Sequence, residues 1–179
     1  MAELKIVITG TPGVGKTTAL STVSDQPPVT TEEATSDELA KIKNTTTVAF
    51  DFGEVLLDDG TQLRIYGTPG QVRFKHMWDI TAQGALGFII LIDITRDNPV
   101  EDLALYIESF EQFIRNTSAV IGITRINDAD LEASPNCLEP FYNYLEKKDL
   151  CLPIMVVDPR SKDDMVDLLM ALIAMLEYA

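Results

Sequence analysis

Apolar runs and helical patterns alternate along this chain. Short, mostly β-branched runs are typical of buried parallel strands, and they span 4–9, 85–92, 119–123 and 153–157. Apolar residues three or four positions apart predict helices over 100–115, 140–147 and 162–178, after a first helix that begins near Thr18. This order predicts an α/β fold in which helices cover both faces of a mostly parallel, six-stranded sheet.

A hairpin interrupts the parallel order. Two strand-like segments, 47–57 and 61–66, flank Asp58-Asp59-Gly60, which is a turn signal, so we expect one antiparallel strand in the sheet. Within the first segment, the alternation predicts that the face carrying Val48, Phe50 and Phe52 is buried. Residues 25–44 have little to bury and predict a long connection, with a short helix over 37–41.

The charge balance narrows the function classes. The chain has 179 residues with 28 acidic and 14 basic side chains, a net charge of −14, which argues against nucleic acid or an anionic membrane surface as the main partner. Two cysteines and one histidine lack the spacing of a zinc site. The start lacks signal-peptide features, and no apolar run reaches the length of a membrane span. We therefore expect one cytoplasmic domain over 1–179, with no integral membrane segment.

The most specific motif follows the first strand. Residues 10–17 read Gly-Thr-Pro-Gly-Val-Gly-Lys-Thr, which is the G-x-x-x-x-G-K-[ST] phosphate-binding loop. Lys16 is expected to reach the β- and γ-phosphate oxygens, and the Thr17 hydroxyl to bind Mg²⁺. A chance match in a glycine-rich turn is the alternative, and the strand and helix that flank the loop argue against it. The motif predicts nucleotide contacts from Gly10, Gly13, Val14, Gly15, Lys16, Thr17 and Thr18.

With two further strings, the chain resembles the Ras-like small GTPases over nearly its full length. Thr47-Val-Ala-Phe-Asp-Phe resembles the first switch, where a threonine binds Mg²⁺ and senses the γ-phosphate. Thr47 is the match, Thr45 and Thr46 are register alternatives, and a plain strand start is the structural alternative. Gly67-Thr-Pro-Gly-Gln-Val-Arg-Phe resembles the second switch. The resemblance implies that Gly70 donates its N–H to the γ-phosphate and that Gln71 orients the attacking water.

The resemblance also implies a guanine pocket, and its residues are altered here. The N-K-x-D motif falls at Thr124-Arg125-Ile126-Asn127, and the S-A-K loop falls at Asp158-Pro159-Arg160. Asn127 offers one acceptor oxygen where a carboxylate offers two, a loss expected to cost about 1–3 kcal/mol unless Asp128 swings in. Pro159 has no N–H to donate to the guanine O6. Guanine is therefore expected from resemblance more than from the residues themselves.

Other departures concern the metal and hydrolysis. Gly67 stands where the second switch normally has an aspartate that holds Mg²⁺ through water, so metal binding is expected to rest on Thr17, Thr47, the phosphates and water. Asp93 either helps there or forms a strand-end turn, which we favour. Pro12 removes one N–H near the γ-phosphate and is expected to slow hydrolysis.

The strings "KNTTTVAFDFG" and "GTPGQ" resemble bacterial GTPases of the MglA and conservon type, which implies an effector and a Roadblock-fold partner that activates or scaffolds. Arg73 and Arg96 are candidate arginine fingers, although surface roles are favoured. The sequence thus predicts a molecular switch that binds GTP and GDP with Mg²⁺ and slowly hydrolyses GTP, with Lys16, Thr47 and Gln71 as catalytic residues. The alternatives are a pseudo-GTPase scaffold with little turnover, and a P-loop ATPase or kinase of relaxed base specificity.

Overall fold

The predicted sheet is present. Across the residues that it describes (4–29, 51–57 and 60–177), the computed structural model has a six-stranded sheet in the order β2-β3-β1-β4-β5-β6. All neighbouring strands are parallel except the hairpin pair β2 and β3. The strands are β1 (Leu4–Gly10), β2 (Asp51–Leu56), β3 (Gln62–Gly67), β4 (Gly87–Asp93), β5 (Ala119–Thr124) and β6 (Ile154–Val156). The α/β fold and the antiparallel hairpin predicted from the sequence are therefore confirmed.

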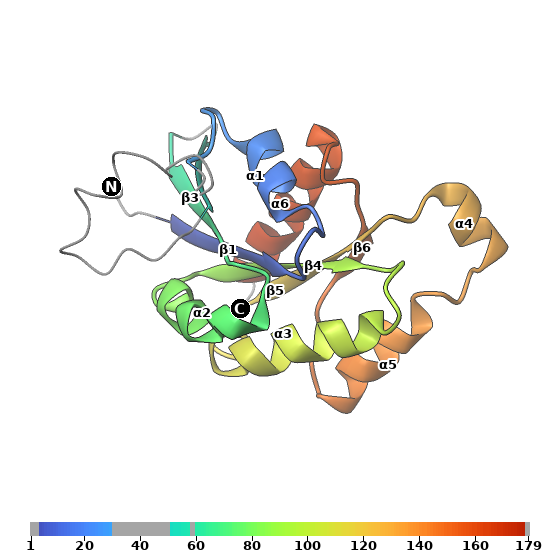
Figure 1. Cartoon of the computed structure of the whole chain (residues 1–179). Helices are drawn as coiled ribbons and strands as arrows, with labels where there is room; N and C mark the ends of the chain where they lie inside the picture. Colours follow the sequence, from blue (N-terminus) through green and yellow to red (C-terminus); the bar gives the residue numbers. More distant parts are fainter. Residues whose placement is uncertain (1–3, 30–50, 58–59, 178–179) are drawn as a thin grey trace.

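Helices cover both faces of the sheet (Figure 1). The helices α1 (Lys16–Val23) and α6 (Lys162–Glu177) pack on one face, and α2 (Lys75–Ala82), α3 (Pro99–Ile114) and α5 (Glu139–Lys147) pack on the other. The short α4 (Asp128–Ala133) lies beyond the sheet edge. Each face has its own apolar cluster, because a sheet between two layers of helices buries both of its sides. None of the helices in the described parts of the chain is long and apolar enough to cross a bilayer.

Two helices were not predicted, and both lack a long apolar stripe. The eight residues of α2 bury only Met77, Trp78, Thr81 and Ala82, and a single 3₁₀ turn over Val72–Phe74 precedes them. The six residues of α4 bury none. A capping box between Asn127 and Asp130 starts α4, so local hydrogen bonds rather than hydrophobic periodicity determine it. The predicted helix over 37–41 lies outside the described residues.

The predicted buried face of β2 is wrong at the positions that the structure describes. Gly53 is buried against α1, where an added Cβ would lie 2.0 Å from the Ser24 hydroxyl oxygen. Phe52 is only half-buried and stacks on Tyr66 of the neighbouring strand, with ring centroids 5.1 Å apart. Asp51 shares the α1 side with Gly53, since alternate residues of a strand face the same way. The helix packs so closely on β2 that a glycine, and not an aromatic residue, meets it.

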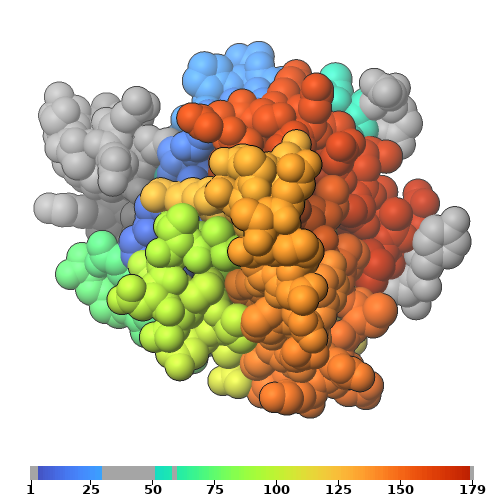
Figure 2. Space-filling model, turned by 90° about the vertical axis from the view of Figure 1, so that its right-hand side faces the viewer, coloured from blue at the N-terminus to red at the C-terminus, as the bar shows by residue number. Residues whose placement is uncertain are grey.

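The fold creates a site at the carboxyl ends of the central strands. The strand β1 pairs with β3 on one side and β4 on the other, so connections leave it in opposite directions, which is where open α/β sheets bind ligands. The loop from Gly10 to Lys16 lies at this point. In the view of Figure 2, α4 forms the front of the molecule between the start of α3 and the start of α6.

Candidate functional site

Glycines shape the loop between β1 and α1. Gly10, Gly13 and Gly15 all have positive φ angles, of 148°, 75° and 112°. At Gly10 an added Cβ would lie 2.3 Å from the Leu91 carbonyl oxygen, and at Gly15 it would lie 2.9 Å from Cγ of Pro159. These two positions exclude a side chain by space as well as by backbone angle.

Lys16 begins α1 and folds back over the loop. Its Nζ donates hydrogen bonds to the carbonyl oxygens of Gly10 and Thr11, both at 2.8 Å. The side chain is 9% exposed, and this burial lowers the pKa of Lys16 to about 8, against the opposing effect of the Asp51 carboxylate. A buried cation therefore stands at the N-terminus of a helix, where an anion is doubly favoured.

A carboxylate from β2 reaches the same end of α1. The hydroxyl of Thr17 donates to Oδ2 of Asp51 over 2.5 Å. Asp51 pairs with Gly67 across the hairpin, and an added Cβ on Gly67 would lie 3.1 Å from the Cβ of Asp51. The carboxylate thus lies beside the space that a side chain at position 67 would enter. Hydroxyl and carboxylate oxygens are ligands that suit Mg²⁺ directly or through water.

The turn after β3 lies against the phosphate loop. An added Cβ on Gly70 would lie 2.6 Å from the Pro12 nitrogen and 2.7 Å from Nζ of Lys16. No described residue accepts a hydrogen bond from the Gly70 N–H. The next residue, Gln71, is exposed. The structure thus brings Gly70 together with Lys16, and leaves Gln71 at the surface beside them.

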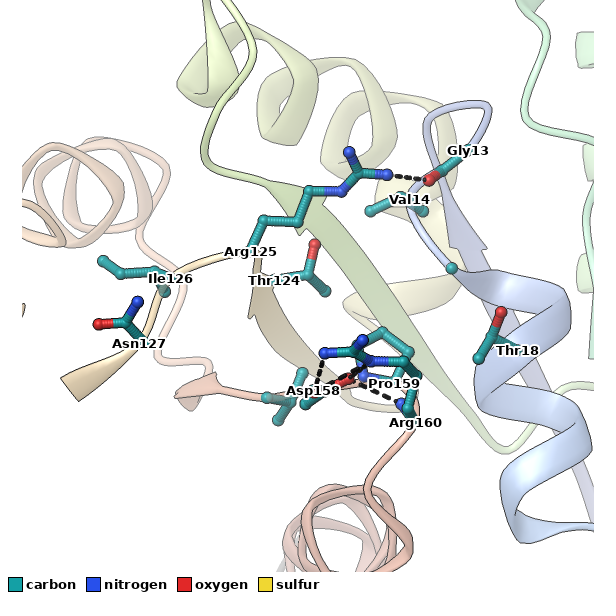
Figure 3. Close-up of a pocket in the computed structure, with 12 residues that line it drawn as sticks. Gly13, Val14, Thr18, Thr124, Arg125, Ile126, Asn127, Asp158, Pro159 and Arg160 are labelled. Carbon is teal, nitrogen blue, oxygen red and sulfur yellow. Dashed lines mark hydrogen bonds and ion pairs between the residues drawn. The ribbon is translucent and has the colours of Figure 1, made fainter. Parts of the chain in front are cut away.

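A cavity of about 550 Å³ adjoins the loop on its other side. Arg125 extends across the cavity toward the loop, and its Nη2 donates to the Gly13 carbonyl at 2.7 Å (Figure 3). Its Nε lies 3.2 Å from Oδ2 of Asp93. Asp93 also accepts hydrogen bonds from the N–H and the hydroxyl of Thr95, so the predicted strand-end turn is confirmed. The same carboxylate forms the ion pair with Arg125. The cavity is lined by Gly13, Val14, Gly15, Thr18, Thr124, Arg125, Ile126, Asn127, Val157, Asp158, Pro159 and Arg160.

Polar groups at the far end of the cavity are already bonded within the protein. The Asn127 side-chain oxygen accepts from the N–H of Asp130 at 3.0 Å, as the cap of α4. The Asp158 carboxylate accepts from the N–H and the guanidinium of Arg160, which holds the pKa of Asp158 at about 2. Pro159 has no N–H to donate, and its ring lies against Gly15, where an added Cβ would lie 2.9 Å from Cγ of Pro159.

The cavity therefore brings four residues of the predicted loop, Gly13, Val14, Gly15 and Thr18, together with the residues predicted to contact the base, while Gly10, Lys16 and Thr17 do not line it. The two candidate arginine fingers have other partners. Arg96 forms an ion pair with Asp102, and Cζ of Arg73 lies 4.8 Å from the centroid of the Phe74 ring. Thr47, with its register alternatives Thr45 and Thr46, lies outside the described residues. Its predicted place at the metal stays a prediction.

The sequence of the chain matches a known protein family. The sequence model of the Ras family matches residues 5–141, which include the phosphate loop, the β2–β3 hairpin and the motif over 124–127. The chain belongs to the Ras family. The base-side loop 158–160 lies beyond the matched residues.

Individual Ras-family relatives are distant. An uncharacterised protein of Methanocaldococcus jannaschii is 29% identical over 143 residues, which cover 77% of this chain and 81% of that protein. The GTP-binding protein YPT1 of Saccharomyces cerevisiae is 29% identical over 129 residues, and the Ras-related protein RabG2 of Dictyostelium discoideum is 28% identical over 132 residues. The matched region covers 72% of this chain in both, but only 57% and 59% of those two proteins.

A solved structure supports the fold alone. The bacterial selenocysteine-specific elongation factor EF-Sec superposes with a TM-score of 0.68 over the whole of this chain and 29% of its own, at 20% identity. A likeness at this identity carries no information on what this chain binds.

One site residue, Asp51, was missed by the sequence analysis. The Ras-family second switch normally opens with an aspartate, and Gly67 stands there instead. Counting back from the hairpin turn places Asp51 directly opposite Gly67, so the register would have revealed it. The signal was a carboxylate at the position of this strand that pairs with Gly67.

Proposed function

We propose that the chain is a small GTPase that binds GTP and GDP with Mg²⁺, slowly hydrolyses GTP to GDP and phosphate, and acts as a molecular switch. The observation that carries this proposal is the placement of Lys16, which is buried, folded over the phosphate loop and held by two of its carbonyls. A buried ammonium with two fixed acceptors is preorganised for phosphate oxygens rather than for a surface ion pair.

Phosphate recognition follows from the backbone. The loop from Gly10 to Thr17 is proposed to present backbone N–H groups to an anion in front of α1, whose dipole favours an anion. Lys16 neutralises charge on the β- and γ-phosphates, and Val14, Gly15 and Thr18 contact the remaining oxygens and the sugar side. The glycine angles of Gly13 and Gly15 fit this role because a wrapped loop needs left-handed residues.

The residues at Thr17 are suited to Mg²⁺. The Thr17 hydroxyl is the predicted direct ligand, with Thr47 as the second, and Asp51 supplies the carboxylate that Gly67 lacks. Within the described ranges no group of three or more His, Cys, Asp or Glu side chains could hold a metal ion. Phosphate and water oxygens are therefore part of the proposed ligand set. Mg²⁺ held by Thr17, Thr47 and Asp51 would supply positive charge against the phosphates.

Hydrolysis is assigned to the second switch. Gly70 donates its N–H to the γ-phosphate, and Gln71 orients the attacking water. Pro12 lies against Gly70 and narrows this space, which fits a slow reaction. Gln71 is exposed, and so it is free to turn toward the phosphate when nucleotide is present.

A binding module with little turnover is the second candidate, and the base side favours it. Thr124, Arg125, Asn127, Asp158, Pro159 and Arg160 form the proposed base pocket. The Asn127 oxygen and the Asp158 carboxylate already have partners there, so base discrimination is expected to be weak. The same feature leaves open an ATPase of relaxed base specificity.

The finer classification rests on sequence strings. We propose an MglA- or conservon-type GTPase of bacterial origin that works in the cytoplasm with a Roadblock-type regulator and an effector. Since Arg96 is bonded to Asp102 and Arg73 lies over the Phe74 ring, the catalytic arginine is left for this regulator to supply. Neither nucleic acid nor an integral membrane segment is part of this proposal.

Single-turnover hydrolysis tests the proposal. Protein loaded with GTP and Mg²⁺ is expected to release phosphate slowly, and Gln71→Ala is expected to slow release by about a hundredfold with GDP affinity unchanged. Gln83→Ala is the matched control, since Gln83 is exposed at the end of α2. Binding without any release would favour the scaffold, and equal rates for wild type and Gln71→Ala would remove Gln71 from the mechanism.

A further inference from the structure

Three consecutive residues of the second switch are anchored to three different elements. The N–H of Thr68 donates to the Ile8 carbonyl at 2.9 Å, and its hydroxyl donates to the Thr9 hydroxyl at 2.7 Å, both on β1. The carbonyl of Pro69 accepts from the indole N–H of Trp78 on α2 at 2.7 Å. The carbonyl of Gly70 accepts from the hydroxyl of Tyr106 on α3 at 3.1 Å.

The two aromatic anchors are part of the core. Trp78 and Tyr106 are fully buried, with ring centroids 5.1 Å apart, and Trp78 also stacks on Phe110 at 5.8 Å. Neither ring is able to swing away without opening the packed layer between α2, α3 and the sheet. Burial raises the pKa of Tyr106 far above its ordinary value, so the phenol remains protonated and remains a donor.

The geometry of the peptide bond determines where the N–H groups of Gly70 and Gln71 point. In a trans peptide the C=O and the following N–H point opposite ways, and the described chain has no cis peptide. Because the Pro69 carbonyl points to Trp78, the Gly70 N–H points away from it. Because the Gly70 carbonyl points to Tyr106, the Gln71 N–H points away from that ring. The phosphate loop lies beside the same residue, since a Cβ added to Gly70 would meet the Pro12 nitrogen and Nζ of Lys16.

We propose that Trp78 and Tyr106 are positioning residues for the γ-phosphate: they fix the two peptide units that aim the Gly70 N–H and carry Gln71. This inference rests on the proposed function, since it assumes a triphosphate in front of Lys16. The two aromatic side chains hold the turn in place before the nucleotide binds. Little conformational entropy is therefore lost when the terminal phosphate is recognised. The exposed residues after Gly70 are then the part of the switch that moves.

Tyr106→Phe tests this inference with the loss of a single oxygen. The affinity for a non-hydrolysable GTP analogue, GMPPNP, is expected to fall about fivefold relative to GDP, which is the effect of one neutral hydrogen bond. Hydrolysis is expected to slow by a similar factor, while GDP affinity changes less than twofold. Tyr142→Phe, at an exposed position on α5, is the matched control and should change neither ratio.

Trp78 supplies a second readout, because it is the only tryptophan in the chain. Its indole N–H touches the switch, so its emission should differ between the GDP and GMPPNP forms of the wild type, and the difference should shrink in Tyr106→Phe. Trp78→Phe, which keeps a ring but loses the donor, should lower the GMPPNP-to-GDP affinity ratio as Tyr106→Phe does.

The outcomes separate the two proposals. A wild type that binds neither GMPPNP nor GDP contradicts the proposed function and this inference with it. A wild type that binds both, with an unchanged affinity ratio in folded Tyr106→Phe, contradicts the positioning role alone. A fall in stability with equal losses for GDP and GMPPNP would assign Tyr106 to packing and overturn the inference.

Discussion

The phosphate side and the base side of this site use their polar groups in opposite ways. On the phosphate side, Lys16 lies beside Gly70, and no described residue accepts a hydrogen bond from the Gly70 N–H. On the base side, Asn127 caps a helix and Asp158 is bonded to Arg160. The difference teaches that phosphate recognition resides in loop geometry that few residues can supply, whereas base recognition depends on side chains that can be turned to other tasks.

Arg125 joins the two sides. Arg125 bonds the Gly13 carbonyl of the phosphate loop while Asp93 holds its guanidinium. The base-side strand β5 thus supports the phosphate loop even where base-reading groups are missing. This arrangement explains how the first half of the site is able to remain intact beside an altered second half.

Removal of Lys16 should break the phosphate side most severely. Lys16→Ala takes away the buried ammonium and the hydrogen bonds that it donates to the Gly10 and Thr11 carbonyls, so triphosphate affinity should fall by about a hundredfold or more. Calorimetric titration with GTP measures it, with Lys147→Ala, an exposed lysine on α5, as the control. A Lys16→Ala protein that binds GTP normally would remove the phosphate loop from the account.

A methyl group at Gly70 should have the next largest effect. Gly70→Ala places a Cβ against the Pro12 nitrogen and Nζ of Lys16, and overpacking of this kind costs about 2 kcal/mol. The loss should appear as about thirtyfold weaker binding of GMPPNP relative to GDP. Gly84→Ala is the control for a loss of stability away from the site, because Gly84 has open space around it but a φ of 72° that strains any side chain. Equal weakening of GMPPNP and GDP binding in Gly70→Ala would mean that general destabilisation, not loss of the γ-phosphate space, is responsible.

The lowered pKa of Lys16 predicts a pH dependence for the nucleotide-free protein. Between the folded pKa of about 8 and the ordinary value of 10.5, the unfolded chain holds more protons than the folded one, so the free energy of unfolding should rise with pH in this window. The rise should be on the order of 2 kcal/mol. Urea unfolding of wild type and Lys16→Met between pH 8 and 10 measures it by difference. Parallel curves would show that Lys16 is not desolvated.

The smallest effect is expected from repairing the base side. Asn127→Asp keeps a good helix cap and restores a second carboxylate oxygen, so the preference for GTP over ITP, which lacks the exocyclic amine, should rise about tenfold or less. Asn143→Asp adds the same charge at an exposed position on α5 and should leave the preference unchanged. No gain in Asn127→Asp would place the base beyond reach of position 127.

Sequence patterns predicted most of the fold because the helices and strands that form the core have long apolar repeats. The helix predicted over 100–115 is α3, and its apolar residues at helical spacing, such as Leu103 and Phe110, are buried. The elements that were missed have other causes: α4 forms through its Asn127 cap, and β2 buries Gly53 because α1 leaves no room for a side chain. Neither cause is visible as hydrophobic periodicity.

The site was predicted where a motif is contiguous and missed where it is not. The loop 10–17 is one string, so its residues could be listed from sequence alone. Asp51 and Gly67 are sixteen positions apart and meet only through the hairpin register. Trp78 and Tyr106 act through backbone carbonyls, which leave no mark on the residue types of the turn that they hold.

The central claim is that an intact phosphate side in a Ras-family chain binds guanine nucleotides despite its altered base side. Calorimetric titration of nucleotide-free protein with GTP, GDP and ATP, each with Mg²⁺, tests this claim most directly. The account predicts micromolar or tighter binding of GTP and GDP, with ATP at least about tenfold weaker. Equal binding of GTP and ATP, or no binding of any of them, would contradict it.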